Sequence, residues 1–336
     1  MTPTNPTPAR RSRRRRRRSA IGSVVVAAGA LLAISATAPT VYAGTAPAGA
    51  RSDAAEQPCS LASQPPLTVA HPGQAPPAAA ILRLLAERLR SVPADAQTGR
   101  YAFTALQQHA ADSTFGGSCV ETGTAYAAER RWRADDGSAQ VTGIPWHHDP
   151  TNVPPGDTTT YPAGGLPGVV PGPVPTDPAV LGAALDAAYQ PIAAASLAPP
   201  QPLRAADNSR QRRHTGTAAR LRAVAELTGW HYTNRAARRA VLVVLADTTG
   251  LAYRGSVAGY PGAIAVSADS GEWRDLLVIH PGTGAVLAYE QVLLRNGHQL
   301  GVHTPYSNLR MRYIAQGRTA HPGQAPASSA ATVATR

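Results

Sequence analysis

The 336-residue sequence predicts an α+β fold, in which an antiparallel sheet meander is covered by a few helices. Two observations carry this prediction. The last third of the chain alternates apolar and polar residues in short runs divided by Gly- and Asp-containing turns, as antiparallel strands do. Ahead of it, apolar residues recur at helical spacing in Thr217–Thr228 and Arg235–Ala246. The connectors are rich in Pro and Gly, and both termini are predicted to be disordered.

The first ordered elements follow the same two periodicities. Ile81–Arg90 has the apolar spacing of a helix and ends just before a proline. Tyr101–Leu106 alternates as a strand does. Ala125–Arg133 is ambiguous by pattern alone, but the Asp135–Ser138 turn after it favours a strand. Gln140–Gly143 then begins the return strand.

A long Pro- and Gly-rich connector is expected over 144–178. A short helix, Ala179–Tyr189, should follow it, because Pro178 suits a first helical turn where its missing N–H is not needed. Four strands are predicted in the last third of the chain, at Leu251–Val257, Gly262–Ser267, Leu276–Ile279 and Val286–Leu294.

Residues 1–43 are predicted to direct export. Eight arginines between Arg10 and Arg18 precede an apolar segment, 21–38, and a small-residue site at Ala43-Gly44. These are the charged region, the apolar region and the cleavage site of a signal peptide. The apolar segment, of about 18 residues, is also close to the minimum length of a spanning helix. A cleaved signal and a retained membrane anchor therefore both fit, and the Gly, Ser and Thr within the segment favour cleavage.

The rest of the chain is expected to form a flexible linker over 44–77, one extracytoplasmic domain over 78–312 and a disordered tail over 313–336. Net charge is +12, but the leader arginines supply most of it, so no nucleic-acid partner is expected. The heptapeptide Ala-His-Pro-Gly-Gln-Ala-Pro occurs at Ala70–Pro76 and again at Ala320–Pro326. One copy near each end does not predict a solenoid.

Cys59 and Cys119 are the two cysteines. In an exported chain an even pair predicts a disulfide. The bridge would close a loop of about 60 residues, worth about 4 kcal/mol in the chain-entropy model. Two free thiols, or one reactive nucleophile, are the alternatives.

A set of short motifs occurs in a fixed order along the chain. The motifs are Trp132–Ser138, Pro175–Leu181, Asp247–Leu251, Leu276–Ile279 and His280–Leu287. In order and spacing this set resembles an uncharacterised family of actinobacterial envelope proteins, single-pass or exported, that are often encoded beside extracytoplasmic-function sigma factors. The resemblance spans about 78–294 and implies an extracytoplasmic domain without known catalytic residues. The chain departs from that family at His280, where an Asp is usual.

No catalytic motif is recognisable, so no catalytic residue, cofactor or metal is expected. His147-His148-Asp149 could supply metal ligands, but a solvated loop is the favoured interpretation. Asp269-Ser270-Gly271 is interpreted as a hairpin turn rather than a serine nucleophile. The remaining candidates are interpreted as turn or surface residues: Asp135, Asp136, Asp247, His280, His298 and His303.

These observations favour a non-enzymatic exported or membrane-tethered module that senses or binds something at the cell envelope. Its expected partner is an apolar small ligand or an envelope protein, with membrane contact through 21–38 if that segment is retained. One alternative is a secreted hydrolase in which His147, His148 or His280 converges with an Asp or Ser. The other is a structural cell-wall-associated protein, which the Pro-rich stretches suggest.

Overall fold

The computed structural model describes residues 57–58, 60–116, 119–148, 155–166, 170, 172–195 and 216–326, all within one compact unit. These residues form a mixed α+β fold dominated by an antiparallel sheet, which confirms the predicted fold class. The leader, the Ala43-Gly44 site and segment 21–38 lie outside the described residues, as do 44–56 and 327–336. Among the described residues no helix is long and apolar enough to cross a membrane.

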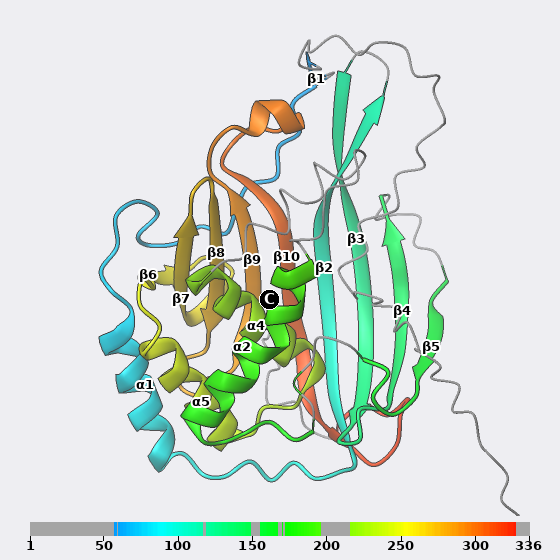
Figure 1. The fold of residues 1–336 in the computed structure, drawn as a ribbon, viewed down its shortest axis with the longest axis vertical. Helices are drawn as coiled ribbons and strands as arrows, with labels where there is room; N and C mark the ends of the chain where they lie inside the picture. The colour runs from blue at the N-terminus through cyan, green and yellow to red at the C-terminus, as the bar shows by residue number, and fades with distance from the viewer. Residues whose placement is uncertain are drawn as a thin grey trace, which may run out of the picture. The chain divides into compact units, whose positions relative to one another are not determined.

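Within this part of the chain, nine strands form one open antiparallel sheet in the order β5-β4-β3-β2-β10-β9-β8-β7-β6. The strands are β2 (Tyr101–Gly116), β3 (Cys119–Ala134), β4 (Ala139–His147), β5 (Asp157–Tyr161), β6 (Ala252–Val257), β7 (Tyr260–Ser270), β8 (Trp273–Ile279), β9 (Val286–Leu293) and β10 (Tyr306–Thr319). A short strand, β1 (Gln57–Pro58), pairs parallel with β3. The predicted hairpin and the predicted four-strand meander are both present, and β10 joins them by pairing with β2 and β9 (Figure 1).

The helices lie over one face of this sheet (Figure 1). They are α1 (Ala79–Ser91), α2 (Pro178–Ala195), α4 (Thr217–Trp230) and α5 (Arg235–Ala246). Asp177 Oδ1 caps α2 by accepting from the N–H of Ala179 at 2.9 Å, so the predicted start at Pro178 is confirmed. Asn234 Oδ1 caps α5 in the same way, accepting from Ala237 N at 2.9 Å.

The strands bury side chains on both faces because residues alternate across the sheet. On β8, Leu277 and Ile279 join the core beneath the helices. Their neighbours Leu276 and Val278 belong to a second apolar cluster, which also contains Val69. Each such Leu or Ile contributes about 2 kcal/mol when fully buried. The near-continuous apolar run of β8 is therefore explained by cover on both faces.

The prediction of a flexible linker over 44–77 is wrong for 60–77. Residues 68–77 run along the outer edge of β6, where Ala70 N donates to Ser256 O at 3.0 Å and Tyr253 N donates to Pro76 O at 2.7 Å. The preceding residues contact β9 and β10, where Ser307 N donates to Gln64 O at 2.8 Å. An edge strand presents unpaired N–H and C=O groups, and the linker satisfies them despite its low apolar content. Composition alone cannot reveal such backbone pairing.

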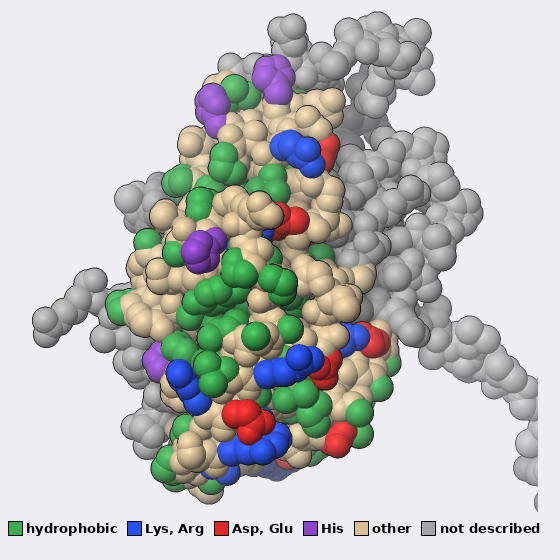
Figure 2. Space-filling model, turned by 90° about the vertical axis from the view of Figure 1, so that its left-hand side faces the viewer, with side chains coloured by type: hydrophobic (Ala, Val, Ile, Leu, Met, Phe, Trp, Pro, Cys, Tyr) green, Lys and Arg blue, Asp and Glu red, His purple; other side chains and the backbone are tan. Residues whose placement is uncertain are grey.

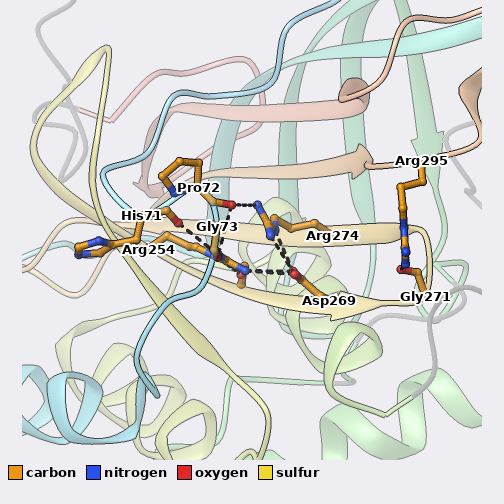
Figure 3. Close-up of polar contacts among 9 residues, drawn as sticks. His71, Pro72, Gly73, Arg254, Asp269, Gly271, Arg274 and Arg295 are labelled. Atoms are coloured by element: carbon orange, nitrogen blue, oxygen red, sulfur yellow. Dashed lines mark hydrogen bonds and ion pairs between the residues drawn. The ribbon is translucent and has the colours of Figure 1, made fainter.

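Arg254 and Arg274 fix the first heptapeptide copy to the sheet (Figure 3). Arg254, 3% exposed, donates to the carbonyls of His71 and Gly73, and its Nε donates to Ser267 Oγ at 2.7 Å. Arg274 donates to Pro72 O at 2.8 Å. The second copy is held differently, through a hydrogen bond from Trp132 Nε1 to Gln324 O at 2.7 Å. Because the same peptide makes unrelated contacts at its two positions, the repeat does not define a structural unit.

Two further predicted boundaries are wrong. The disordered tail was expected from 313, but β10 continues to Thr319 and pairs with β2 down to Tyr101. Its buried Leu309, Met311 and Tyr313 occupy alternate positions, so packing against the helices orders this part of the chain. The connector over 144–178 contains the end of β4 and all of β5, a mostly polar edge strand that pairs through its backbone with β4.

Candidate functional site

The histidine pair expected as candidate metal ligands does not form a metal site in the part of the chain described. His148 Nε2 lies 3.1 Å from Asp112 Oδ2, whereas His147 Nδ1 lies 3.0 Å from the carbonyl of Pro145. Asp149 falls outside the described residues. No group of three or more His, Cys, Asp or Glu side chains among the described residues could hold a metal ion.

Asp136 lies in a turn, as predicted, whereas Asp269 and Ser270 belong to strand β7 rather than to the hairpin turn predicted for Asp269-Ser270-Gly271. Asp136 Oδ1 accepts from the N–H of Ser138 at 2.8 Å in the β3–β4 hairpin. Asp269 lies at the end of β7, just before the turn into β8, and forms an ion pair with Arg274 at 2.8 Å. Asp247 caps the C-terminus of α5.

The remaining histidine candidates lie at turns, as predicted for surface or turn residues. His280 Nδ1 accepts from Thr283 N at 3.2 Å, so the His280 side chain closes its turn. His298 lies in the short 3₁₀ helix Gly297–Leu300, and His303 in the loop after it. These placements do not bring His147, His148 and His280 together around one nucleophile.

The cysteine pair is not tested by the described residues. Cys59 lies outside them, and for Cys119 only the backbone is described. Gln57 pairs with Cys119 across β1 and β3, which brings the chain two residues before Cys59 alongside Cys119. The disulfide therefore stays a prediction.

A polar cavity that is partly open to solvent lies where the ends of β2, β3 and β10 meet the turn between α4 and α5. Its volume is about 160 Å³. Arg133 reaches it from β3, and His231 and Tyr232 reach it from the turn. Pro173 and Val174, in the loop before α2, line another side. Sequence analysis did not identify this group.

Local structure explains why these side chains meet. The alternation of β3 places Arg131 and Arg133 on the face that is covered by helices. Arg131 lies over the ring of Trp230, the last residue of α4, with its Cζ 4.1 Å from the centre of the ring. The backbone N–H of His231 donates to Leu227 O at 2.8 Å and closes the helix. His231 is thereby held beside Arg133 at the end of α4.

The hydrogen bond between Arg133 and His231 fixes the protonation state of the imidazole. Arg133 Nη1 lies 3.2 Å from His231 Nδ1, and a guanidinium group only donates. Nδ1 must therefore be the acceptor, which leaves the proton on Nε2. Burial, followed by the charge of Arg133, lowers the pKa of His231 to about 3. The Val170 carbonyl has a smaller, opposite effect on this pKa, and the imidazole is neutral at physiological pH.

Two buried donors at the cavity have no hydrogen-bond partner. They are Arg133 Nε and His231 Nε2, on side chains that are 4% and 3% exposed. The Tyr232 hydroxyl also lacks a partner at hydrogen-bond geometry, and burial together with the charge of Asp95 raises its pKa to about 12. Buried donors are almost always satisfied, so this cluster requires an acceptor.

The carboxylates beside the cavity are already engaged. Asp95 accepts from Arg235 N at 2.5 Å and pairs with Arg238 at 3.0 Å. Asp135 lies 3.7 Å from Arg318. Among the described residues Arg133 has no carboxylate within 4.0 Å, and burial lowers its pKa below the usual arginine value without neutralising it near pH 7. The charges of Asp135 and Asp136 act on Arg133 from beyond ion-pair distance and offset only part of the cost of its burial.

The arrangement can bind a ligand more readily than it can catalyse a reaction. The described lining contains no Ser, Thr or Cys side chain, and Nδ1 of the imidazole is occupied by Arg133.

Comparison with protein-family models finds no match for this chain, and comparison with curated proteins also finds none. The resemblance to the actinobacterial envelope family stays a prediction.

Proposed function

We propose that this chain is a non-enzymatic binding or sensing module, exported or tethered at the cell envelope, whose ligand occupies the Arg133–His231 cavity. The leader over 1–43 supports the location, because it has the three regions of an export signal. The observation that carries the binding function is the pair of unpartnered buried donors, Arg133 Nε and His231 Nε2, beside one cavity.

The polar lining favours a polar ligand over the apolar one expected from a covered sheet. The space between the helices and the sheet is filled by buried side chains, including Leu221, Leu277 and Tyr289. A nucleic-acid partner is not proposed. On the face in Figure 2 basic side chains lie beside acidic ones and do not form a continuous basic stripe. One such pair in the described residues is Arg90 and Glu87, 3.0 Å apart.

Location and binding are tested separately. Protease treatment of intact cells should degrade an epitope placed after residue 326, and sequencing of the mature N-terminus should show whether the chain begins at Gly44. Protection of the epitope until the cells are lysed would contradict the envelope location. For binding, the purified chain is screened against a library of small metabolites by thermal unfolding, alongside Val174→Phe.

Val174→Phe narrows the cavity from a partly buried loop position without touching Arg133 or His231. A ligand in this cavity should raise the unfolding midpoint of the wild-type chain and not that of the variant. Val180→Phe is the matched control, since Val180 is 56% exposed on α2 and does not line the cavity. Equal shifts in all three proteins would place the ligand elsewhere and contradict the proposal.

A further inference from the structure

The geometry points to the chemical class of the ligand: we infer that the Arg133–His231 cavity takes a small organic monocarboxylate. Its carboxylate would face Arg133 and His231, and its short apolar part would face Ala102, Pro173 and Val174. This inference rests on the proposed function, which assigns the same cavity to ligand binding.

The charge balance requires an anion. Asp95 is matched by Arg238, and Asp135 by Arg318, at 3.0 and 3.7 Å. Arg133 is left as a buried cation without an ion-pair partner. The charges of Asp135 and Asp136 offset only part of the cost of its burial, and an anion in the cavity would offset more of it. A neutral ligand would leave this imbalance, and a cationic one would increase it.

The donors select an acceptor-only head group. Because His231 accepts from Arg133 at Nδ1, its Nε2 can only donate. Arg133 Nε is also a donor, and both atoms lack a partner. Arg133 Nη2 already donates to the Val170 carbonyl at 3.3 Å, so only Nε of the guanidinium is free. A carboxylate offers one oxygen to Arg133 Nε and one to His231 Nε2, and it has no hydrogen to direct at either donor.

The volume of the cavity and the apolar part of its lining limit the rest of the ligand. A volume of about 160 Å³ compares with the engineered cavity of about 150 Å³ that holds benzene, so about six non-hydrogen atoms fit. Ala102, Pro173 and Val174 form an apolar part of the lining that phosphate or sulfate would leave in contact with water. Butyrate, with about six non-hydrogen atoms, matches both parts of the cavity.

The experiment is calorimetric titration of the purified full chain at pH 7.5 with butyrate, butyramide and inorganic phosphate. Butyramide has the shape of butyrate without its charge. We expect butyrate to bind at least tenfold more tightly than either of the others. Arg133→Gln should abolish this preference, whereas Arg130→Gln should keep it, because Arg130 is exposed on the same strand and does not line the cavity.

Val174→Phe keeps the test decisive if Arg133→Gln fails to fold. This variant retains the charge of Arg133 and removes space, so butyrate binding should weaken at least tenfold. The inference is overturned if butyrate and butyramide bind equally, if Val174→Phe binds butyrate normally, or if no butyrate binding is measurable. Phosphate binding that depends on Val174 would overturn the carboxylate class and leave the proposed function standing. A cytoplasmic location would overturn the proposed function and leave the carboxylate result unaffected.

Discussion

The hydroxyl of Tyr289 donates a hydrogen bond to the carboxyl group of Asp275, and both residues are fully buried. Tyr289 lies on β9 and Asp275 on β8. Burial raises the pKa of Asp275 to about 7, against the opposing effects of the Tyr289 hydrogen bond and the charge of Arg222. Asp269 adds to the rise. A carboxyl group in the core thus changes its charge near neutral pH.

This relationship predicts that stability falls as pH rises toward 8. A folded-state pKa above the unfolded value of 3.8 means that the native protein binds the proton more tightly. The contribution of Asp275 is therefore complete below about pH 4 and is lost as pH rises through about 7. Asp275→Asn should remove this loss, so its unfolding midpoint should exceed that of wild type more at pH 8 than at pH 5. An unchanged difference between the two pH values would contradict the assignment.

A second buried carboxylate, Glu290, depends on Arg310. Glu290 is 0% exposed and accepts from Arg310 Nη2 at 2.6 Å, from Ser307 Oγ at 2.7 Å and from Leu67 N at 2.9 Å. Arg310→Met should leave this charge unpaired and destabilise the fold by about 3 kcal/mol in urea unfolding. Adding Glu290→Gln should recover part of the loss. If the double variant is less stable than Arg310→Met, the unpaired charge is not the cause.

An exposed ion pair provides the control for that experiment. Arg83 and Asp247 are 3.0 Å apart, but both side chains are 62% exposed. Arg83→Gln should change the free energy of unfolding by less than about 1 kcal/mol. A comparable loss in Arg83→Gln and Arg310→Met would show that burial of Glu290 is not what makes its pair important.

The contacts in Figure 3 predict that Arg254 holds residues 68–77 against β6. Its guanidinium bonds to three carbonyls of the heptapeptide, to Ser267 and to Asp269 at 3.2 Å. Hydrogen bonds from charged groups contribute about 2 kcal/mol each, so Arg254→Gln should release the segment locally. Limited thermolysin digestion should then cut near Leu67 faster than in wild type.

Arg295→Gln is the matched control for the digestion. Arg295 donates to Gly271 O at 3.0 Å from the same region of the sheet, but does not contact the heptapeptide (Figure 3). Its cleavage pattern should equal that of wild type. Faster cutting near Leu67 in Arg295→Gln as well would indicate a general loss of stability rather than release of the segment.

Periodicity predicted the elements that bury apolar side chains at regular spacing. It failed where order comes from other sources. In β10 arginines alternate with Leu309, Met311 and Tyr313, and the strand was overlooked beside an Ala/Ser/Thr-rich terminus. Strand β5 is mostly polar and is ordered by pairing with β4, through the backbone and through a Thr142–Thr158 side-chain hydrogen bond of 3.0 Å, so its sequence carries little apolar signal.

The candidate site was not predictable from local patterns for a related reason. Arg133 and His231 are 98 residues apart in sequence, and each stands beside ordinary strand or helix residues. One signal was present: Glu129, Arg131 and Arg133 occupy alternate positions of β3, on the face that a strand would turn toward the core. Polar residues at such positions indicate a buried polar network, and only the fold shows what they meet.

The cysteines give the last prediction. Strand β1 pairs Gln57 with Cys119, and Cys59 follows Gln57 by only two residues in the sequence. A bridge from Cys59 to Cys119 would therefore join two neighbouring parts of the chain. It would close a loop of about 60 residues and stabilise the oxidised protein by about 4 kcal/mol. Peptide mapping without reduction should recover the two cysteine peptides as one linked species, and dithiothreitol should lower the unfolding midpoint. The unfolding midpoint of the Cys59→Ser variant should equal that of reduced wild type and should not change when dithiothreitol is added. Recovery of two alkylated thiols from the protein purified without reductant would rule the bridge out.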